Sequence, residues 1–222
     1  MPTPPISAIL WDNDGVLVDT EHLFYQVNRE LFHEHGIALT AQHFFDWFLQ
    51  DNCGAWHLLT QFDAGQIVEL RNERNRRYSQ RLHEQGELLT PGIGAVVQQL
   101  AQRFRMAVVT SARHEDFHII HRNTNLLQHF EFVLTDSDYV NSKPSPEPYL
   151  LGLQRLGLTA QQALVVEDSP RGLQAALAAG IGCIGIRSAL TANYPFEGAL
   201  CVVENNQQLL QAIEHYAGVG AA

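Results

Sequence analysis

The chain has 222 residues, 45% of them hydrophobic, which is ordinary for a soluble globular protein and enough to bury a sizeable core. Its formal net charge of −10 argues against nucleic acid or an anionic membrane as partners, because both bind basic surfaces. No run approaches the ~18 apolar residues of a membrane span, and no cationic leader opens the chain. The three widely spaced cysteines predict free thiols. We therefore expect a cytoplasmic monomer.

The first predicted element is the short apolar strand 8–10, which runs into Trp11-Asp12-Asn13-Asp14-Gly15. In an open parallel sheet, ligands bind beyond the carboxyl ends of the strands, so Asp12 and Asp14 should project there while Asn13 turns away. Two carboxylates this close repel each other unless one is protonated or a cation lies between them. Both arrangements suit phosphoryl transfer, in which one Asp attacks phosphorus and the other protonates the leaving oxygen.

Residues 21–89 have helical patterns, with apolar residues at helical spacing from Leu23 to Phe32, an aromatic-rich stretch, and a further helix over 66–84. Beyond Pro91-Gly92, strands are predicted near 106–110, 132–135, 164–167, 183–186 and 201–203, with helical patterns between them. This alternation indicates an α/β fold with a three-layer, Rossmann-like parallel sheet. We expect residues 1–20 and 90–222 to form a discontinuous core, and residues 21–89 to form an inserted all-helical cap.

Hydroxyl groups end the second core strand at Thr110-Ser111. Thr110 is placed to hydrogen-bond a phosphate oxygen, and the backbone amides of Ser111 and Ala112 are further candidate donors. The alternative is a simple helix N-cap, which Thr and Ser favour strongly.

Lys143 is the only lysine among the 14 basic residues; all the others are arginine. It precedes the proline-rich loop 144–148, which fixes where the side chain leaves the backbone. A sole lysine in a stiff loop suggests a compact point charge. We expect it to bind the transferring phosphate and to keep the Asp12 carboxylate ionised.

Two more carboxylates, Glu167 and Asp168, close the strand predicted at 164–167. Acidic residues at a helix start are often only caps. Together with Asp12 and Asp14, however, they provide an oxygen-rich site that suits Mg²⁺, which takes few protein carboxylates, a phosphate oxygen and retained waters. Asp168 is the preferred ligand, and Glu167 is a direct or water-mediated second ligand.

The order of these motifs resembles the haloacid dehalogenase superfamily of phosphohydrolases. The motifs are hhhDxDGVLxDT ending at Thr20, then Thr110, Lys-Pro-x-Pro-x-Pro from Lys143, and Glu-Asp-Ser-x-x-Gly from Glu167. The last two are similar to those of β-phosphoglucomutase and of small sugar-phosphate or phosphoglycolate phosphatases.

By this resemblance Asp12 is the nucleophile and Asp14 the general acid and base, while Thr110 binds phosphate and Lys143 stabilises charge. It also implies that Mg²⁺ is held by Asp12, the Asp14 carbonyl and Asp168. Two departures from the pattern, Trp11 for the usual Phe and Asn13 for an apolar residue, are not expected to touch the chemistry.

The resemblance implies a Mg²⁺-dependent hydrolase of small phosphorylated metabolites, such as sugar phosphates, that acts through an aspartyl-phosphate intermediate. The main alternative is a phosphosugar mutase, although Phe24 and the segment 51–54 lack the His and Arg that mutases carry in the cap. A non-catalytic phosphometabolite-binding protein is a further alternative, but such a protein would normally have lost one of Asp12, Asp14 or Lys143.

Two charged clusters lie outside the motifs. The first shares one helix face and comprises His114, His118 and His121. A solvated face is expected there rather than a zinc site, because no Cys or carboxylate completes the set at ligand spacing. The second is a stripe on the 66–84 helix comprising Arg71, Arg74, Arg77 and Arg81. Solvation or pairing with Glu is expected for this stripe, and substrate attraction is the alternative.

Overall fold

The computed structural model describes residues 5–218. The expectation that no cationic leader opens the chain rests partly on residues 1–4, which lie outside this range. Six strands within it form one parallel sheet in the order β3-β2-β1-β4-β5-β6. The strands are β1 (Ala8–Trp11), β2 (Arg105–Val109), β3 (Phe132–Leu134), β4 (Ala163–Glu167), β5 (Gly182–Ile186) and β6 (Cys201–Val203). The predicted α/β parallel sheet is confirmed.

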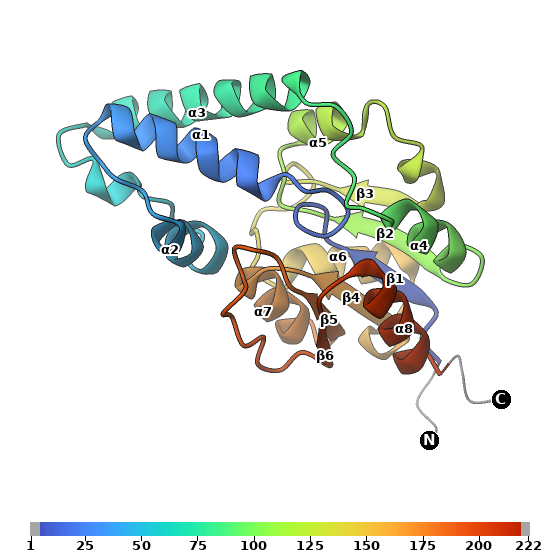
Figure 1. Cartoon of the computed structure of the whole chain (residues 1–222). Coiled ribbons are helices and arrows are strands. Elements are labelled where there is room, and N and C mark those ends of the chain that lie inside the picture. Colours follow the sequence, from blue (N-terminus) through green and yellow to red (C-terminus); the bar gives the residue numbers. More distant parts are fainter. Residues whose placement is uncertain (1–4, 219–222) are drawn as a thin grey trace.

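Helices cover both faces of the sheet (Figure 1). One face carries α4 (Ile93–Leu100), α5 (His114–His121) and α8 (Asn206–Tyr216), and the other carries α6 (Glu147–Leu156) and α7 (Pro170–Ala178). Ile9 and Trp11 of β1 pack into the first layer, and their neighbours Ala8 and Leu10 pack into the second. Successive strand side chains point to opposite faces, so the central strand β1 is buried on both sides.

The helices between β1 and α4 lie to one side of the sheet (Figure 1). They are α1 (Glu21–Glu34), α2 (Ala41–Phe44), the π-helical turn η1 (Phe45–Gln50), the 3-10 turn η2 (Trp56–Leu58) and α3 (Ala64–Glu84). Part of their apolar surface forms a separate hydrophobic cluster, in which the rings of Phe44 and Phe48 stack at 4.9 Å, while Tyr78 and Leu82 of α3 join the core cluster. This separate cluster supports an all-helical cap; its boundaries at 21–89 stay a prediction.

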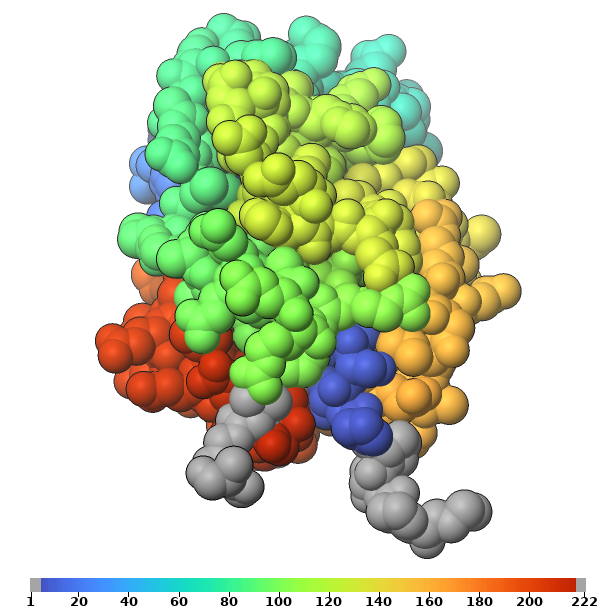
Figure 2. All heavy atoms as spheres, turned by 90° about the vertical axis from the view of Figure 1, so that its right-hand side faces the viewer, coloured from blue at the N-terminus to red at the C-terminus, as the bar shows by residue number. Residues whose placement is uncertain are grey.

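The helix α3 begins two residues earlier than predicted because Asp63 caps it: the Asp63 carboxylate accepts the amide of Gln66, whose side chain caps Asp63 in return. At its other end α3 packs against α5 of the core (Figure 2). There Arg122 donates to the backbone carbonyls of Leu82, His83 and Gln85, at an end of the helix where carbonyl groups lack intrahelical donors.

Two further short 3-10 turns, η3 (Leu126–His129) and η4 (Ala160–Gln162), precede β3 and β4. The cysteines Cys53, Cys183 and Cys201 are free, as predicted. Across residues 5–218 no helix combines the length and apolar character that spanning a bilayer would take.

Candidate active site

The loop after β1 turns sharply past the strand ends. The Asp12 amide donates to a carbonyl of β4 at 3.0 Å, so Asp12 still follows the sheet. The Asn13 carbonyl then accepts the amides of three following residues, and Gly15 adopts φ 79°, a conformation that favours glycine. A Cβ atom on Gly15 would lie 1.9 Å from an oxygen of Asp168. Glycine is therefore required at position 15 for the loop after β1 to approach the end of β4.

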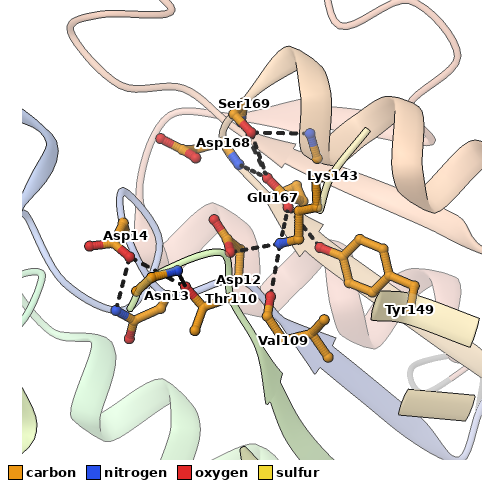
Figure 3. A network of polar contacts seen from close by, with 12 residues as sticks. Asp12, Asn13, Asp14, Val109, Thr110, Lys143, Tyr149, Glu167, Asp168 and Ser169 are labelled. Carbon is orange, nitrogen blue, oxygen red and sulfur yellow. Dashed lines mark hydrogen bonds and ion pairs between the residues drawn. The ribbon is translucent and has the colours of Figure 1, made fainter. Parts of the chain in front are cut away.

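The Asp14 carboxylate is held by three side-chain donors, two of which, Asn13 and Thr110, are drawn in Figure 3. Thr20 donates its hydroxyl to Oδ1, while the Asn13 amide (3.2 Å) and the Thr110 hydroxyl (3.4 Å) donate to Oδ2. The expectation that Asn13 stays clear of the proposed chemistry is therefore wrong, because the turn folds its side chain against the next carboxylate.

Lys143 lies behind Asp12 and is 2% exposed. Its Nζ donates to Asp12 Oδ1 at 2.7 Å, to Glu167 Oε1 at 2.7 Å and to the Val109 carbonyl at 2.8 Å (Figure 3). Burial alone would lower the pKa of Lys143, but the two carboxylates outweigh it and raise that pKa, so the ammonium stays charged. All three N–H groups point to protein oxygens. The structure thus places Lys143 against the expected nucleophile but shows no N–H free for the predicted phosphate contact.

Glu167 is held by protein donors, and its predicted role as a direct or water-mediated metal ligand stays a prediction. Its Oε1 accepts Lys143 and the Tyr149 hydroxyl (2.7 Å), and its Oε2 accepts the Ser169 hydroxyl (3.1 Å) and the Asp168 amide (3.2 Å). It is fully buried and does not line the cavity described below. Protein donors surround both oxygens, so Glu167 anchors Lys143 and the Asp168 loop from behind.

Carboxylate oxygens gather at the ends of β1 and β4 and form a site suited to a hard cation. Oxygens of Asp12, Glu167 and Asp168 lie within 4.8 Å of one another. Both Asp168 oxygens are buried and lack hydrogen-bond partners among the described residues, and burial, with the neighbouring carboxylates, raises the pKa of Asp168 well above its usual range. Burial and Glu167 raise the pKa of Asp12 to about 7, against the opposing effect of Lys143. Buried, unpaired carboxylate oxygens fit Mg²⁺, which would neutralise them.

A cavity of about 340 Å³ lies in front of these residues. Asp12, Asp14 and Asp168 line its floor, together with the end of β2. The predicted phosphate-binding segment, residues 110–112, lines this cavity. It differs from the prediction in one contact, because the Ala112 amide donates to the Thr110 hydroxyl at 3.0 Å. The Ser111 hydroxyl, in contrast, is buried without a partner in the described chain and is available to a ligand.

The helical segment supplies the opposite wall of the cavity, which is lined by Phe24, Phe44, Phe48, Trp56, Arg71 and Arg74. The Arg71 guanidinium lies 5.1 Å from the Trp56 ring, and that of Arg74 lies 4.7 Å from the Phe24 ring. Arg74 donates only to the neutral side chains of Asn75 and Asn28. Burial, with Arg71 adding to it, lowers the pKa of Arg74 to about 10.

The four arginines of the stripe on α3 therefore have two different surroundings. Arg77 pairs with Glu34 at 2.6 Å and Arg81 with Glu30 at 3.1 Å, as predicted. Arg71 and Arg74 have no carboxylate within salt-bridge distance among residues 5–218 and face the cavity instead.

Two charged residues, Glu21 and Arg171, are among the cavity residues that the sequence analysis did not predict. Glu21 has a buried Oε2 with no partner in the described structure, and burial raises its pKa to about 8. The sequence held one signal for Glu21, namely its position directly after Asp19-Thr20, where the first motif ends. Arg171 donates to Asn52 Oδ1 at 2.7 Å across 119 residues of sequence, a contact that no local pattern indicates.

The histidine cluster is also split. His114 and His118 are exposed, with their Nε2 atoms 3.1 Å apart, as expected for a solvated face. His121 is 4% exposed, and its Nε2 lies 2.8 Å from Asn13 Oδ1, so the prediction is wrong for this residue. The physical reason is that α5 packs against both the sheet and α3, which buries this end of the helix.

The parallel sheet with an acidic cluster at its strand ends is the arrangement that the motifs predict for a haloacid dehalogenase-like hydrolase. The family model described as haloacid dehalogenase-like hydrolase matches residues 9–186, and the chain belongs to this family. It is 28% identical over 183 residues to the phosphorylated carbohydrates phosphatase of Thermotoga maritima, covering 79% of this chain and 82% of the relative. It is 28% identical to the phosphoglycolate phosphatase of Yersinia pseudotuberculosis, covering 94% of this chain and 93% of the relative.

Among solved structures, the chain is similar to CbbY from Rhodobacter sphaeroides in complex with phosphate. The TM-score is 0.78 and the identity 25%, and the match covers 92% of this chain and 96% of CbbY.

Proposed function

We propose that the protein is a Mg²⁺-dependent phosphomonoester hydrolase that acts on a small phosphorylated metabolite with Asp12 as its nucleophile. The observation that carries this proposal is the contact from Lys143 Nζ to Asp12 Oδ1, which holds Asp12 from behind while Asp12, Asp14 and the unpaired Asp168 line the cavity. The relatives named as phosphatases of phosphorylated carbohydrates and of phosphoglycolate support the same reaction.

The chemistry follows from which oxygens are free. Lys143 occupies Asp12 Oδ1, so Oδ2 attacks phosphorus, the bond to the leaving oxygen breaks, and an aspartyl phosphate forms. Asp14 gives its proton to the leaving oxygen, then takes one from the water that attacks phosphorus and releases Asp12. Bound Mg²⁺, held by Asp12, Asp168 and the Asp14 carbonyl, would neutralise the negative charge of the phosphoryl group.

The cavity is suited to a small polyol phosphate. Its volume of about 340 Å³ accommodates a metabolite of a few carbon atoms beside the phosphate. The unpaired Glu21 carboxyl can accept a substrate hydroxyl, and the Ser111 hydroxyl can donate to a phosphate oxygen. The aromatic wall excludes water from the reacting centre.

A phosphosugar mutase is the second candidate, favoured by one observation. A mutase must hold two phosphates in turn, and Arg71 and Arg74 are unpaired cations on the wall opposite Asp12. Phe24, at the position where mutases carry His, instead packs against Arg74. We therefore assign these arginines to a second anionic group of the substrate and retain hydrolysis as the reaction.

A screen of phosphorylated metabolites with phosphate release as the readout tests this proposal. Turnover should require Mg²⁺, disappear with EDTA and be absent from Asp12→Asn. A second assay combines β-glucose 1-phosphate, Mg²⁺ and a trace of the bisphosphate and follows phosphorus resonances. Accumulation of glucose 6-phosphate without free phosphate would overturn hydrolysis in favour of the mutase.

A further inference from the structure

A buried chain of hydrogen bonds leads from α5 to Asp14. The Thr124 hydroxyl lies 3.2 Å from His121 Nδ1, His121 Nε2 lies 2.8 Å from Asn13 Oδ1, and Asn13 Nδ2 lies 3.2 Å from Asp14 Oδ2. Asn13 is 0% exposed and His121 is 4% exposed. His121 and Asn13 are 108 residues apart in sequence, so only the packing of α5 on the β1 loop joins them.

The direction of this chain follows from which groups can donate. Until it takes up the proton that it gives to the leaving group, the Asp14 carboxylate only accepts hydrogen bonds, so the Asn13 amide must donate to it and present its oxygen to His121. Because an amide oxygen only accepts, His121 must then carry its proton on Nε2. Its Nδ1 is left as an acceptor 3.2 Å from the Thr124 hydroxyl, which also lies within donating distance of the His121 carbonyl at 3.3 Å. In this orientation the chain directs the Asn13 amide as a donor at Asp14 Oδ2.

An apolar residue at position 13 would pack in the same interior without any of these bonds. Burying an amide and an imidazole costs free energy unless both are fully hydrogen-bonded. This protein carries both groups, as Asn13 and His121. Among the described residues, Asp14 is the member of their hydrogen-bond chain that lines the cavity.

We propose that Asn13 and His121 are positioning residues that fix the orientation of the Asp14 carboxylate for proton transfer to the leaving group. This inference rests on the proposed function, in which Asp14 is the general acid. Thr20 and Thr110 hold the carboxylate from other directions, so the Asn13 bond contributes a share of its alignment. Proton transfer depends on the donor lying within hydrogen-bond reach of the leaving oxygen, and a misaligned carboxyl loses part of its effect.

The test compares two substrates in the presence of Mg²⁺. p-Nitrophenyl phosphate has a leaving group that needs little protonation, whereas a sugar phosphate such as glucose 6-phosphate, or the sugar phosphate turned over fastest in the screen, needs it fully. Asn13→Leu should lower kcat for the sugar phosphate by about tenfold, and for the aryl ester by less than about threefold. His121→Gln keeps a donor for Asn13 Oδ1 and should stay close to the wild-type ratio. Asp14→Asn gives the ratio expected when the acid is lost entirely.

Two variants separate positioning from packing. Asn13→Leu with His121→Phe replaces both polar partners by apolar groups, which should recover stability while the unequal loss on the two substrates persists. Phe117→Leu disturbs the ring that packs 4.5 Å from His121 without touching a hydrogen bond of the chain, and it should lower both rates alike.

Two results would overturn the positioning role: equal losses of kcat on both substrates for Asn13→Leu, or a wild-type ratio of the two kcat values in the double variant. Asn13 and His121 would then be a polar pair that hydrogen-bonds within the core without affecting Asp14. Failure of the wild-type protein to hydrolyse either ester with Mg²⁺ would instead count against the proposed function itself.

Discussion

Lys143 and Asp12 form a buried ion pair with Nζ and Oδ1 2.7 Å apart, although 131 residues separate them in sequence. The same ammonium group also neutralises Glu167 at 2.7 Å. Removing one member of a buried pair leaves charge without compensation. Loss of Lys143 would leave the carboxylates of Asp12 and Glu167 buried without a neutralising charge.

Lys143→Met should therefore abolish turnover and lower the free energy of unfolding by roughly 3–5 kcal/mol. Urea denaturation followed by circular dichroism measures the second effect. Arg155→Gln is the matched control, because Arg155 pairs with Asp138 at the surface and should cost less than about 1 kcal/mol. Unchanged stability in Lys143→Met would contradict the buried charge network.

Asp168→Asn should raise the melting temperature of the metal-free protein while removing activity. Both Asp168 oxygens are buried without partners, so removing the charge relieves a desolvation cost. Mg²⁺ should raise the melting temperature of the wild-type protein, because it binds the folded state, and should no longer do so in the variant. Differential scanning fluorimetry with and without Mg²⁺ measures both effects. Asp51→Asn changes the net charge equally at an exposed position and should retain the Mg²⁺ response; an unchanged response in Asp168→Asn would exclude Asp168 as a ligand.

The stability of the protein should fall as the pH decreases through the range from 6.5 to 4 because of His121. Burial, with His118 adding to it, lowers the pKa of His121 from 6.5 to about 4, so in this range the unfolded chain binds the proton more readily than the folded protein. The contribution of His121 is complete above pH 6.5, and on the order of 3 kcal/mol is lost by pH 4.

His121→Gln supplies the comparison, since it keeps a hydrogen-bond donor but does not titrate. Urea denaturation of both proteins at saturating Mg²⁺ isolates the histidine, because the acidic cluster titrates alike in each. The difference in unfolding free energy between the two proteins should shrink from pH 7 to pH 4. A constant difference would show that His121 titrates normally.

Arg74→Met should weaken the binding of substrates that carry a second anionic group. A bisphosphate or a carboxylated phosphate should show KM raised by roughly 10- to 100-fold, the usual effect of removing a charged hydrogen bond, whereas a substrate with one phosphate changes little. Steady-state kinetics on the two substrate classes measure the difference. Arg77→Met is the control, because Arg77 is paired with Glu34 and Glu73 and should leave KM unchanged. Equal effects of the two variants would remove Arg74 from the substrate site.

The sequence by itself determined the layered sheet and the positions of the main acidic residues. Each predicted strand lies within one residue of its observed bounds, because short apolar runs ended by turn residues are a local signal. The same local signals place Asp12, Asp14, Thr110 and Asp168 just after strands. The carboxyl ends of parallel strands meet at one edge of the sheet, so these residues lie together there. The earlier start of α3 was also readable, from the Asp63 capping box.

Only the tertiary structure decided which of several similar residues face the cavity. Arg71 and Arg77 lie on the same helix, yet the first faces the cavity and the second a glutamate, because each contact depends on which segment packs against that face. The identical chemistry of neighbouring histidines gave no sign that His121 alone would be buried against Asn13. Glu167 likewise accepts Lys143 and the Tyr149 hydroxyl, contacts that its position beside Asp168 in the sequence did not indicate. These choices are made by contacts between residues far apart in sequence, and helical periodicity shows that a face exists without showing what covers it.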